Sequence, residues 1–203
     1  MHAHLWFAVL GALALTGCGG VGGQTAGDAD LTLLLGERPA GVHAGIFLAS
    51  ERGFDEAEGV ELEIRATGDP AKLLRRGRVQ AVLLRRDAVA GSGAVCVMAL
   101  IQEPEPDRFV CVTATTLESR RADVVALVKA LQRGYSEAGI DPESAVQAVL
   151  TTRPGLDRET LAAELAEAEG SFAAGVPAFG FLRREAMPPG EFAYGLVGPE
   201  SRE

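Results

Sequence analysis

The sequence predicts an α/β fold in which a mostly parallel sheet is flanked by helices. Three observations support this prediction. Between residues 31 and 84, short apolar runs alternate with helix-like segments in the order strand, helix, strand, helix, strand. The loops between them are short, which is typical of parallel strands joined by right-handed crossovers. The 203-residue chain is also 47% hydrophobic, enough to fill one core of ordinary size.

The first half of the predicted domain alternates strands and helices. Residues 31–35 form a short apolar run, which is typical of a strand buried on both faces. Residues 42–52 predict a helix that ends before a glycine. Residues 60–64 alternate strictly between apolar and charged side chains, as a half-buried strand does. A further helix has Asp69 as its N-cap and proline at its first position, and it ends at Gly77.

Three further strands complete the predicted sheet. Residues 79–84 and 95–101 are apolar runs separated by a glycine-rich turn. Residues 102–107 form a polar break, and residues 109–113 predict one more strand.

From residue 117 onward the sequence is mostly helical. Asp141, followed by proline, starts one helix, and Asp157 caps another that runs to Glu169. After Gly170, prolines and glycines predict loops, with at most a short helix at residues 182–186. An apolar stripe predicts the core-facing side of the helix before Asp141: Val124, Val125, Val128, Leu131 and Tyr135.

The N-terminus predicts export. An apolar run from Leu5 to Leu15 is followed by small residues and then Cys18, a pattern typical of an export signal. The ending resembles a bacterial lipobox, in which the signal is cut before a cysteine that receives a lipid. We therefore expect a signal peptide at residues 1–17, lipid attachment at Cys18 and a flexible glycine-rich tether at residues 18–30. The alternative is an apolar N-terminus on a cytoplasmic protein.

Composition limits the function classes. The net charge of −9 gives no electrostatic footprint for nucleic acid. His43 is the only histidine beyond the signal, and no Cys/His cluster has metal-ligand spacing, so we expect no catalytic residues, metal or cofactor. Cys96 and Cys111 lie in two apolar runs. A disulfide is permitted outside the cytoplasm, but buried free thiols are the alternative that we favour.

Several segments carry a resemblance to one family. Residues 38–49 (RPAGVHAGIFLA), 51–54 and 58–60 resemble the start of ABC-importer solute-binding proteins of the NMT1/THI5-like (thiamine pyrimidine precursor) group. Later segments resemble later parts of that family in the same order: 73–78, 97–102, 108–113, 116–118, 131–135, 141–146 and 154–157.

The resemblance implies a periplasmic-binding-protein-like type II lobe. The family has a whole second lobe between the fourth strand and the returning segment, where this chain has only residues 102–107. We therefore expect a single lobe over residues 31–203, built from family segments at 31–101 and 108–180.

The same resemblance implies a function. We expect a lipid-anchored, extracytoplasmic component that binds a thiamine pyrimidine precursor or related small heteroaromatic and delivers it to a membrane permease without chemistry. A homodimer through the exposed lobe face is a further expectation. One alternative is a truncated, non-transport lipoprotein that is an interaction module or vestigial. The least favoured is a pyrimidine-synthase-type enzyme, since the chain has only Lys72 and Lys129 and lacks a cysteine cluster.

Four residues are the candidate ligand contacts. The resemblance implies that His43 donates a hydrogen bond in the cleft; the alternative is a helix-start histidine that faces solvent. Arg38 either pairs with an anionic or carbonyl group or is a surface charge. Arg85 and Asp87 follow an apolar strand at its carboxyl end, where α/β folds bind ligands. Asp87 either joins this site or pairs with the arginines before it.

A basic stretch surrounds two of these candidates. Residues 72–86 contain six cations and no acid in an otherwise acidic chain. One interpretation is an anion or phosphate site that includes Arg85 and Arg86. In the other, the cations at residues 72–78 complement a helix C-terminus.

Overall fold

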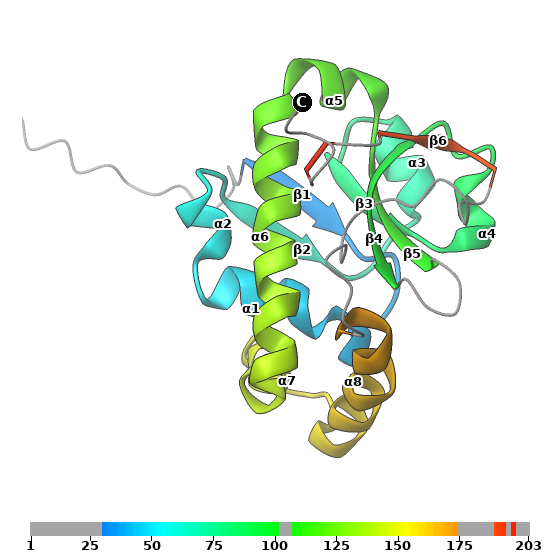
Figure 1. Cartoon of the computed structure of the whole chain (residues 1–203). Coiled ribbons are helices and arrows are strands. Elements are labelled where there is room, and N and C mark those ends of the chain that lie inside the picture. The colour runs from blue at the N-terminus through cyan, green and yellow to red at the C-terminus, as the bar shows by residue number, and fades with distance from the viewer. Residues whose placement is uncertain (1–29, 102–106, 174–188, 194–195, 198–203) are drawn as a thin grey trace, which may run out of the picture.

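The computed structural model describes residues 30–101, 107–173, 189–193 and 196–197, and its strands form one sheet (Figure 1). Within these residues the strand order is β2-β1-β3-β5-β4-β6. β1 pairs in parallel with β2 and β3, and β4 pairs in parallel with β6, whereas β5 runs antiparallel to β3 and β4. The strands are β1 (Leu31–Leu34), β2 (Leu62–Arg65), β3 (Ala81–Leu84), β4 (Val95–Ile101), β5 (Asp107–Val112) and β6 (Glu191–Phe192).

Helices cover both faces of this sheet. The longest, α6, lies in front of β1 and β2 in Figure 1, and α3 and α4 lie on the right and pack on the other face of the sheet. The helices are the 3-10 helix η1 (Gly41–His43), α1 (Ala44–Glu51), α2 (Phe54–Ala57), α3 (Pro70–Arg75), α4 (Arg86–Val89), α5 (Ala114–Ser119), α6 (Arg121–Ile140), α7 (Pro142–Thr152) and α8 (Arg158–Ala173).

Successive side chains along each strand alternate between the two faces of the sheet, so the core has two layers. Leu33 of β1 packs under α1, α6, α7 and α8, whereas Leu34 packs with Leu74 of α3 and Val89 of α4. Successive strand side chains point to opposite faces, so apolar residues at every position bury both faces. The predicted α/β fold with a mostly parallel sheet flanked by helices is confirmed.

Local signals placed the helix starts correctly. Asp69 accepts a hydrogen bond from the Lys72 backbone N–H at 3.0 Å, and Asp141 accepts one from Ser144 N–H at 3.1 Å. Asp157 accepts one from Thr160 N–H at 2.7 Å. These are the N-caps that the sequence predicted.

Other elements differ from the prediction. The single helix expected at residues 42–52 is η1 followed by α1, and Gly53 follows at a φ of 65°. The short helix α2 and the strand β6 were missed, and α5 begins at Ala114 rather than at residue 117. The signal peptide, Cys18, nearly all of the tether and the helix at 182–186 lie outside the described residues.

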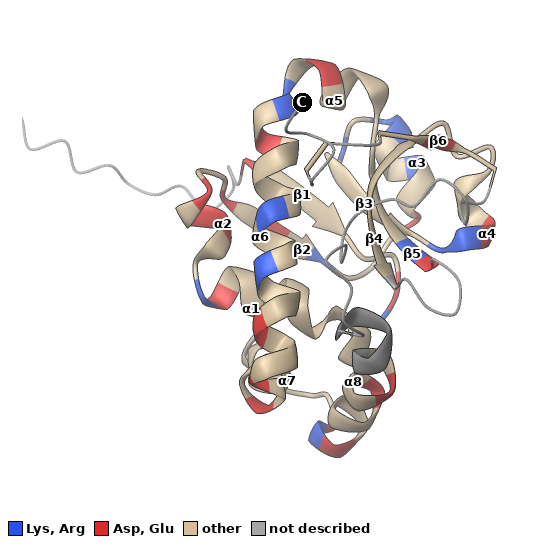
Figure 2. Ribbon diagram, viewed as in Figure 1, with Lys and Arg blue, Asp and Glu red and all other residues tan. Residues whose placement is uncertain are grey.

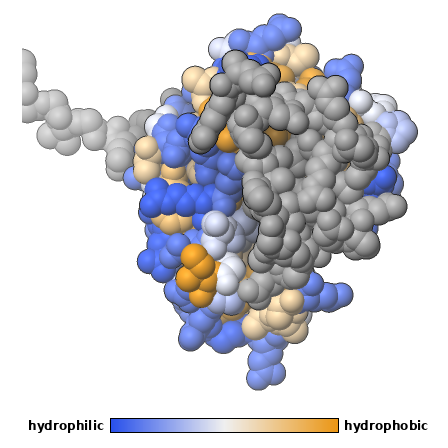
Figure 3. All heavy atoms as spheres, viewed as in Figure 1, coloured by the Kyte–Doolittle hydropathy of each residue, from blue (hydrophilic) through white to orange (hydrophobic). Residues whose placement is uncertain are grey.

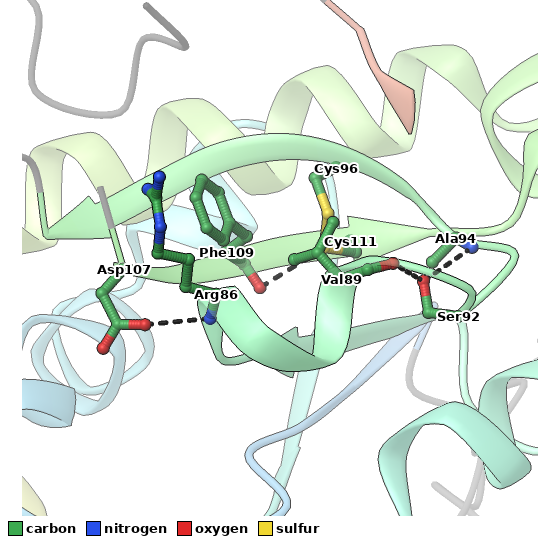
Figure 4. Close-up of a disulfide and its surroundings, with 8 residues drawn as sticks. All are labelled: Arg86, Val89, Ser92, Ala94, Cys96, Asp107, Phe109 and Cys111. Carbon is green, nitrogen blue, oxygen red and sulfur yellow. Dashed lines mark hydrogen bonds between the residues drawn. A yellow bond between two sulfur atoms is a disulfide. The ribbon is translucent and has the colours of Figure 1, made fainter. Parts of the chain in front are cut away.

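The expectation of free thiols is wrong. Cys96 of β4 and Cys111 of β5 form a disulfide, with Cα atoms 3.9 Å apart (Figure 4). The two residues are directly opposite in the antiparallel ladder, and both are fully buried. Side chains opposite each other on antiparallel strands approach closely. The sequence did not reveal the bond because it gives neither the direction of β5 nor its register.

The visible surface has little apolar area. Figure 3 shows the described part of this face as mostly hydrophilic, with small separate hydrophobic areas. Among the described residues, Ile140 is the large apolar side chain that is exposed, at 78%. No helix within the described ranges has the length and apolar character needed to cross a membrane.

Candidate functional site

A cavity of about 330 Å³ lies at the carboxyl ends of β1 and β3. Because β5 is antiparallel to β3, the beginning of β5 lies at this same edge. The carboxyl edge of a parallel sheet is where open α/β folds bind ligands. The residues lining the cavity are Leu35, Gly36, Glu37, Asp69, Pro70, Ala71, Leu83, Leu84, Arg85, Asp87, Ala88 and Arg108.

Gly36 allows the turn after β1 and the start of α3 to meet. Its φ is +75°, a conformation that favours glycine, and a Cβ here would lie 2.2 Å from Cγ of Pro70. Pro70 is fixed at the first helical position after its cap, Asp69. This close approach forms one wall of the cavity.

Glu37 is a charged group of the cavity lining whose carboxylate is contacted by two other side chains. Nε of Arg108 donates a hydrogen bond to its Oε1 at 3.0 Å. Nε2 of His43 lies 3.2 Å from the same oxygen, in a contact that lacks the direction of a good hydrogen bond. The His43 ring and then Arg108 hold the pKa of Glu37 well below its usual range, at about 2, against the opposing effect of partial burial. Glu37 is therefore ionised at neutral pH.

His43 lies behind Glu37 rather than in the cavity. Its side chain is fully buried, and its Nδ1 accepts a hydrogen bond from the Ala40 backbone N–H at 3.1 Å. A neutral imidazole that accepts at Nδ1 carries its proton on Nε2. This nitrogen lies beside the Glu37 carboxylate without a well-directed hydrogen bond, so the buried ring supports Glu37 from behind.

Arg108 connects the ends of β1, β3 and β5. Its side chain also contacts Asp107 Oδ2 at 3.2 Å, and Asp107 Oδ1 accepts a hydrogen bond from Arg86 N–H at 2.9 Å. Arg108 has a φ of 49°, which is uncommon for a residue other than glycine. Two carboxylates therefore hold the Arg108 guanidinium group at this edge, while its backbone conformation costs about 1 kcal/mol or more.

The structure separates the four predicted ligand contacts. Arg85 and Asp87 line the cavity, as their position after β3 suggested, and their contact with a ligand stays a prediction. Arg38 is exposed and is not among the lining residues. His43 is fully buried against Glu37 and is not among the lining residues, so its direct contact with a ligand also stays a prediction.

Sequence reasoning missed Glu37 and Arg108. Glu37 stands just after β1, and its position beside the motif was a usable signal. Arg108 could not be found this way, because only the antiparallel direction of β5 brings it to the carboxyl edge.

No group of three or more His, Cys, Asp or Glu side chains within the described ranges is arranged to hold a metal ion.

The lowered pKa of Glu37 predicts that its contribution to the free energy of unfolding depends on pH. A folded pKa of about 2, against 4.5 in the absence of these contacts, means that ionised Glu37 contributes stability above about pH 4.5. This contribution is lost as the pH falls toward 2. We expect the difference in free energy of unfolding between wild type and Glu37→Gln to be constant near neutrality and to shrink through this window. Urea unfolding at a series of pH values measures it, and a difference that does not change with pH would contradict the account.

Comparisons with known proteins agree on the fold. No protein-family model matches the chain, and no curated protein matches it. A Candida albicans gene product with the generic periplasmic binding protein structural fold is 8% identical, with a TM-score of 0.55 over 70% of this chain and 80% of that chain. The ligand-binding component of an ABC-type import system from Staphylococcus aureus, with zinc bound, is 8% identical, with a TM-score of 0.54 over 67% and 84%.

A protein from Bordetella bronchiseptica RB50 is 9% identical, with a TM-score of 0.58 over 82% of this chain and 95% of that chain. At these identities the likeness shows the fold alone. The described strands and helices form a single lobe with a periplasmic-binding-protein-like fold, as the sequence predicted.

Proposed function

We propose that this chain is an extracytoplasmic solute-binding component of an ABC importer and that the cavity at the carboxyl ends of β1 and β3 binds its solute. The proposal rests mainly on the Glu37 carboxylate, which lines this cavity and is kept ionised by His43 and Arg108. The fold shared with the ligand-binding component of the Staphylococcus aureus import system supports this role.

The lining favours a ligand that brings hydrogen-bond donors. Glu37, Asp69 and Asp87 contribute three carboxylates, and of the two guanidinium groups, that of Arg108 already contacts Glu37 and Asp107. The Arg85 guanidinium makes no ion pair with another described residue and is available for a carbonyl or anionic group. Glu37 is itself paired with Arg108, and Asp69 caps α3. Asp87 and Arg85 are therefore the lining charges that remain for a ligand, and an amine that also carries a carbonyl or anionic group matches both.

The apolar walls favour a compact ring between these polar groups. Leu35, Leu83, Leu84 and Pro70 line the cavity, and its volume of about 330 Å³ is at the small end of ligand sites. A thiamine pyrimidine precursor or related small heteroaromatic combines a flat ring with an amino group. It fits this chemistry, so the ligand class implied by the resemblance belongs to the proposal.

Membrane attachment and a permease partner belong to the same function. We include lipid attachment at Cys18, delivery of solute to a membrane permease, and binding without chemistry. A second lobe missing between β4 and β5 would leave part of the ligand uncovered, since ligand sites usually enclose about 70–90% of the ligand surface. We therefore expect weaker binding than a two-lobed receptor gives, or a homodimer that covers the open face.

A thermal-shift screen of the full chain in mild detergent tests the proposal. The ligands are thiamine pyrimidine precursors, thiamine, riboflavin, taurine and nitrate. A ligand that binds only the folded form raises the unfolding temperature by mass action. We expect a shift with amino-substituted heteroaromatics and none with taurine or nitrate. A cooperative transition that no ligand shifts would contradict the proposal and favour the interaction-module alternative.

A further inference from the structure

The basic patch consists of Lys72 within α3, Arg75 and Arg76 at its end, and Arg78 in the turn that follows it. All four side chains are exposed, and none forms an ion pair within 4 Å with an acid in the described part of the chain. Figure 2 shows Lys and Arg on α3 in a molecule of net charge −9. The four cations therefore form a local concentration of positive charge in an otherwise acidic protein.

Complementing the helix dipole does not account for the whole patch. α3 has only six residues, and Lys72 and Arg75 are the basic residues of its last turn. Arg76 is the C-cap and Arg78 lies beyond the end of the helix, in the turn before β3. The dipole effect falls off within the last turn, so Arg78 gains little from it.

The patch begins at Lys72, next to the cavity-lining start of α3, and its far end at Arg78 lies at the opposite edge of the sheet, beside the point where the chain enters the fold. The Thr32 backbone N–H donates to Oε1 of Gln80 at 2.9 Å, and Gln80 N–H donates to the Thr32 carbonyl at 3.3 Å. These bonds hold the turn after Arg78 against the start of β1. Asp30, the first described residue, is at this edge on the β2 side, where its carboxylate accepts from Glu61 N–H.

We propose that the basic patch binds the anionic headgroups of membrane phospholipids. The inference rests on the lipid attachment proposed at Cys18, which precedes Asp30 by a short stretch, so the sheet edge where the chain enters the fold is the one joined to the membrane anchor. An acidic protein is repelled from an anionic surface unless cations gather where it touches. The planar guanidinium group of arginine pairs with a phosphate through two parallel hydrogen bonds. Clusters of basic residues beside a membrane segment bind anionic lipid.

The arrangement has a functional consequence. With the patch on the lipid surface, the cavity at the opposite sheet edge faces the aqueous phase. The lobe is then held in an orientation that admits solute. The inference does not depend on the identity of the solute or on its binding.

Arginine footprinting tests the inference on the full chain. The protein is reconstituted into nanodiscs of phosphatidylcholine alone or of phosphatidylcholine with phosphatidylglycerol, and phenylglyoxal modification of each arginine is followed by mass spectrometry. We expect Arg75, Arg76 and Arg78 to react at least about threefold more slowly in the anionic discs, because each basic residue near such a surface is attracted to it. High salt should remove the protection. Arg158, exposed at the start of α8, is the internal control and should react equally in both discs.

Equal rates for the patch arginines in the two discs would overturn the inference, and so would protection that is as strong in neutral lipid. Substitution of all four patch residues by glutamine separates this inference from the proposed function. The patch does not line the cavity, so this variant should keep the ligand-induced thermal shift of the wild type. Loss of that shift in the variant would contradict the separation of the two sites.

Discussion

Removal of the Cys96–Cys111 disulfide is expected to lower the free energy of unfolding by about 3 kcal/mol. The bond joins residues that are 15 apart in sequence, and it limits the unfolded chain by closing a loop of that length. Both cysteines are fully buried between β4 and β5, in the layer that contains Phe109. For a chain of this size the loss corresponds to a fall of about 6–12 °C in unfolding temperature.

Thermal unfolding followed by circular dichroism, with and without reductant, measures this effect. The Cys96→Ala, Cys111→Ala double variant should unfold near the temperature of the reduced wild type, and reductant should not change it further. An unfolding temperature of the wild type that is the same in both conditions would show that the bond contributes nothing to stability.

The substitution Gly134→Ala is expected to destabilise the fold by at least about 2 kcal/mol, because it overpacks the crossing of α1 and α6. A Cβ at Gly134 would lie 2.2 Å from the carbonyl oxygen of Gly45 and 2.7 Å from Cβ of Ala49. The backbone of α1 must shift to make room. Tyr135, the next residue, anchors the same crossing through a hydrogen bond of 2.7 Å from its hydroxyl to the Val42 carbonyl.

Gly139→Ala is the matched control on the same helix. A Cβ at Gly139 meets no atom within 4 Å, so this change should leave stability unchanged or raise it by up to about 1 kcal/mol through helix propensity. Urea unfolding of both variants measures the comparison. Equal stability of the two variants would mean that α1 and α6 do not approach as closely as described.

The sequence predicted best what local chemistry decides. Asp69, Asp141 and Asp157 cap helices because an Asp side chain satisfies the free N–H groups of the first turn wherever the helix lies. The apolar runs of β1 and β3 could be recognised because both faces of these strands are buried.

What depends on long-range pairing was not predictable from the chain alone. β6 has two residues and exists only because it pairs with β4, so its sequence has no strand pattern to recognise. The disulfide and the place of Arg108 in the cavity both depend on the direction and register of β5. His43 was singled out through a motif, but a motif does not tell whether the ring enters the cavity or supports Glu37 from behind.

The central claim is that a solute binds beside Glu37, in the cavity at the carboxyl ends of β1 and β3. Isothermal titration of the ligand that gives the largest thermal shift tests this claim most directly, with the wild type compared with Glu37→Gln and Arg38→Gln. Arg38 is adjacent in sequence, but it is exposed and does not line the cavity. We predict that Glu37→Gln raises the Kd at least about tenfold, because hydrogen bonds to a charged group contribute about 1.5–3 kcal/mol, and that Arg38→Gln leaves the Kd unchanged. An unchanged Kd in Glu37→Gln would contradict the claim, and a raised Kd in Arg38→Gln alone would place the solute outside this cavity.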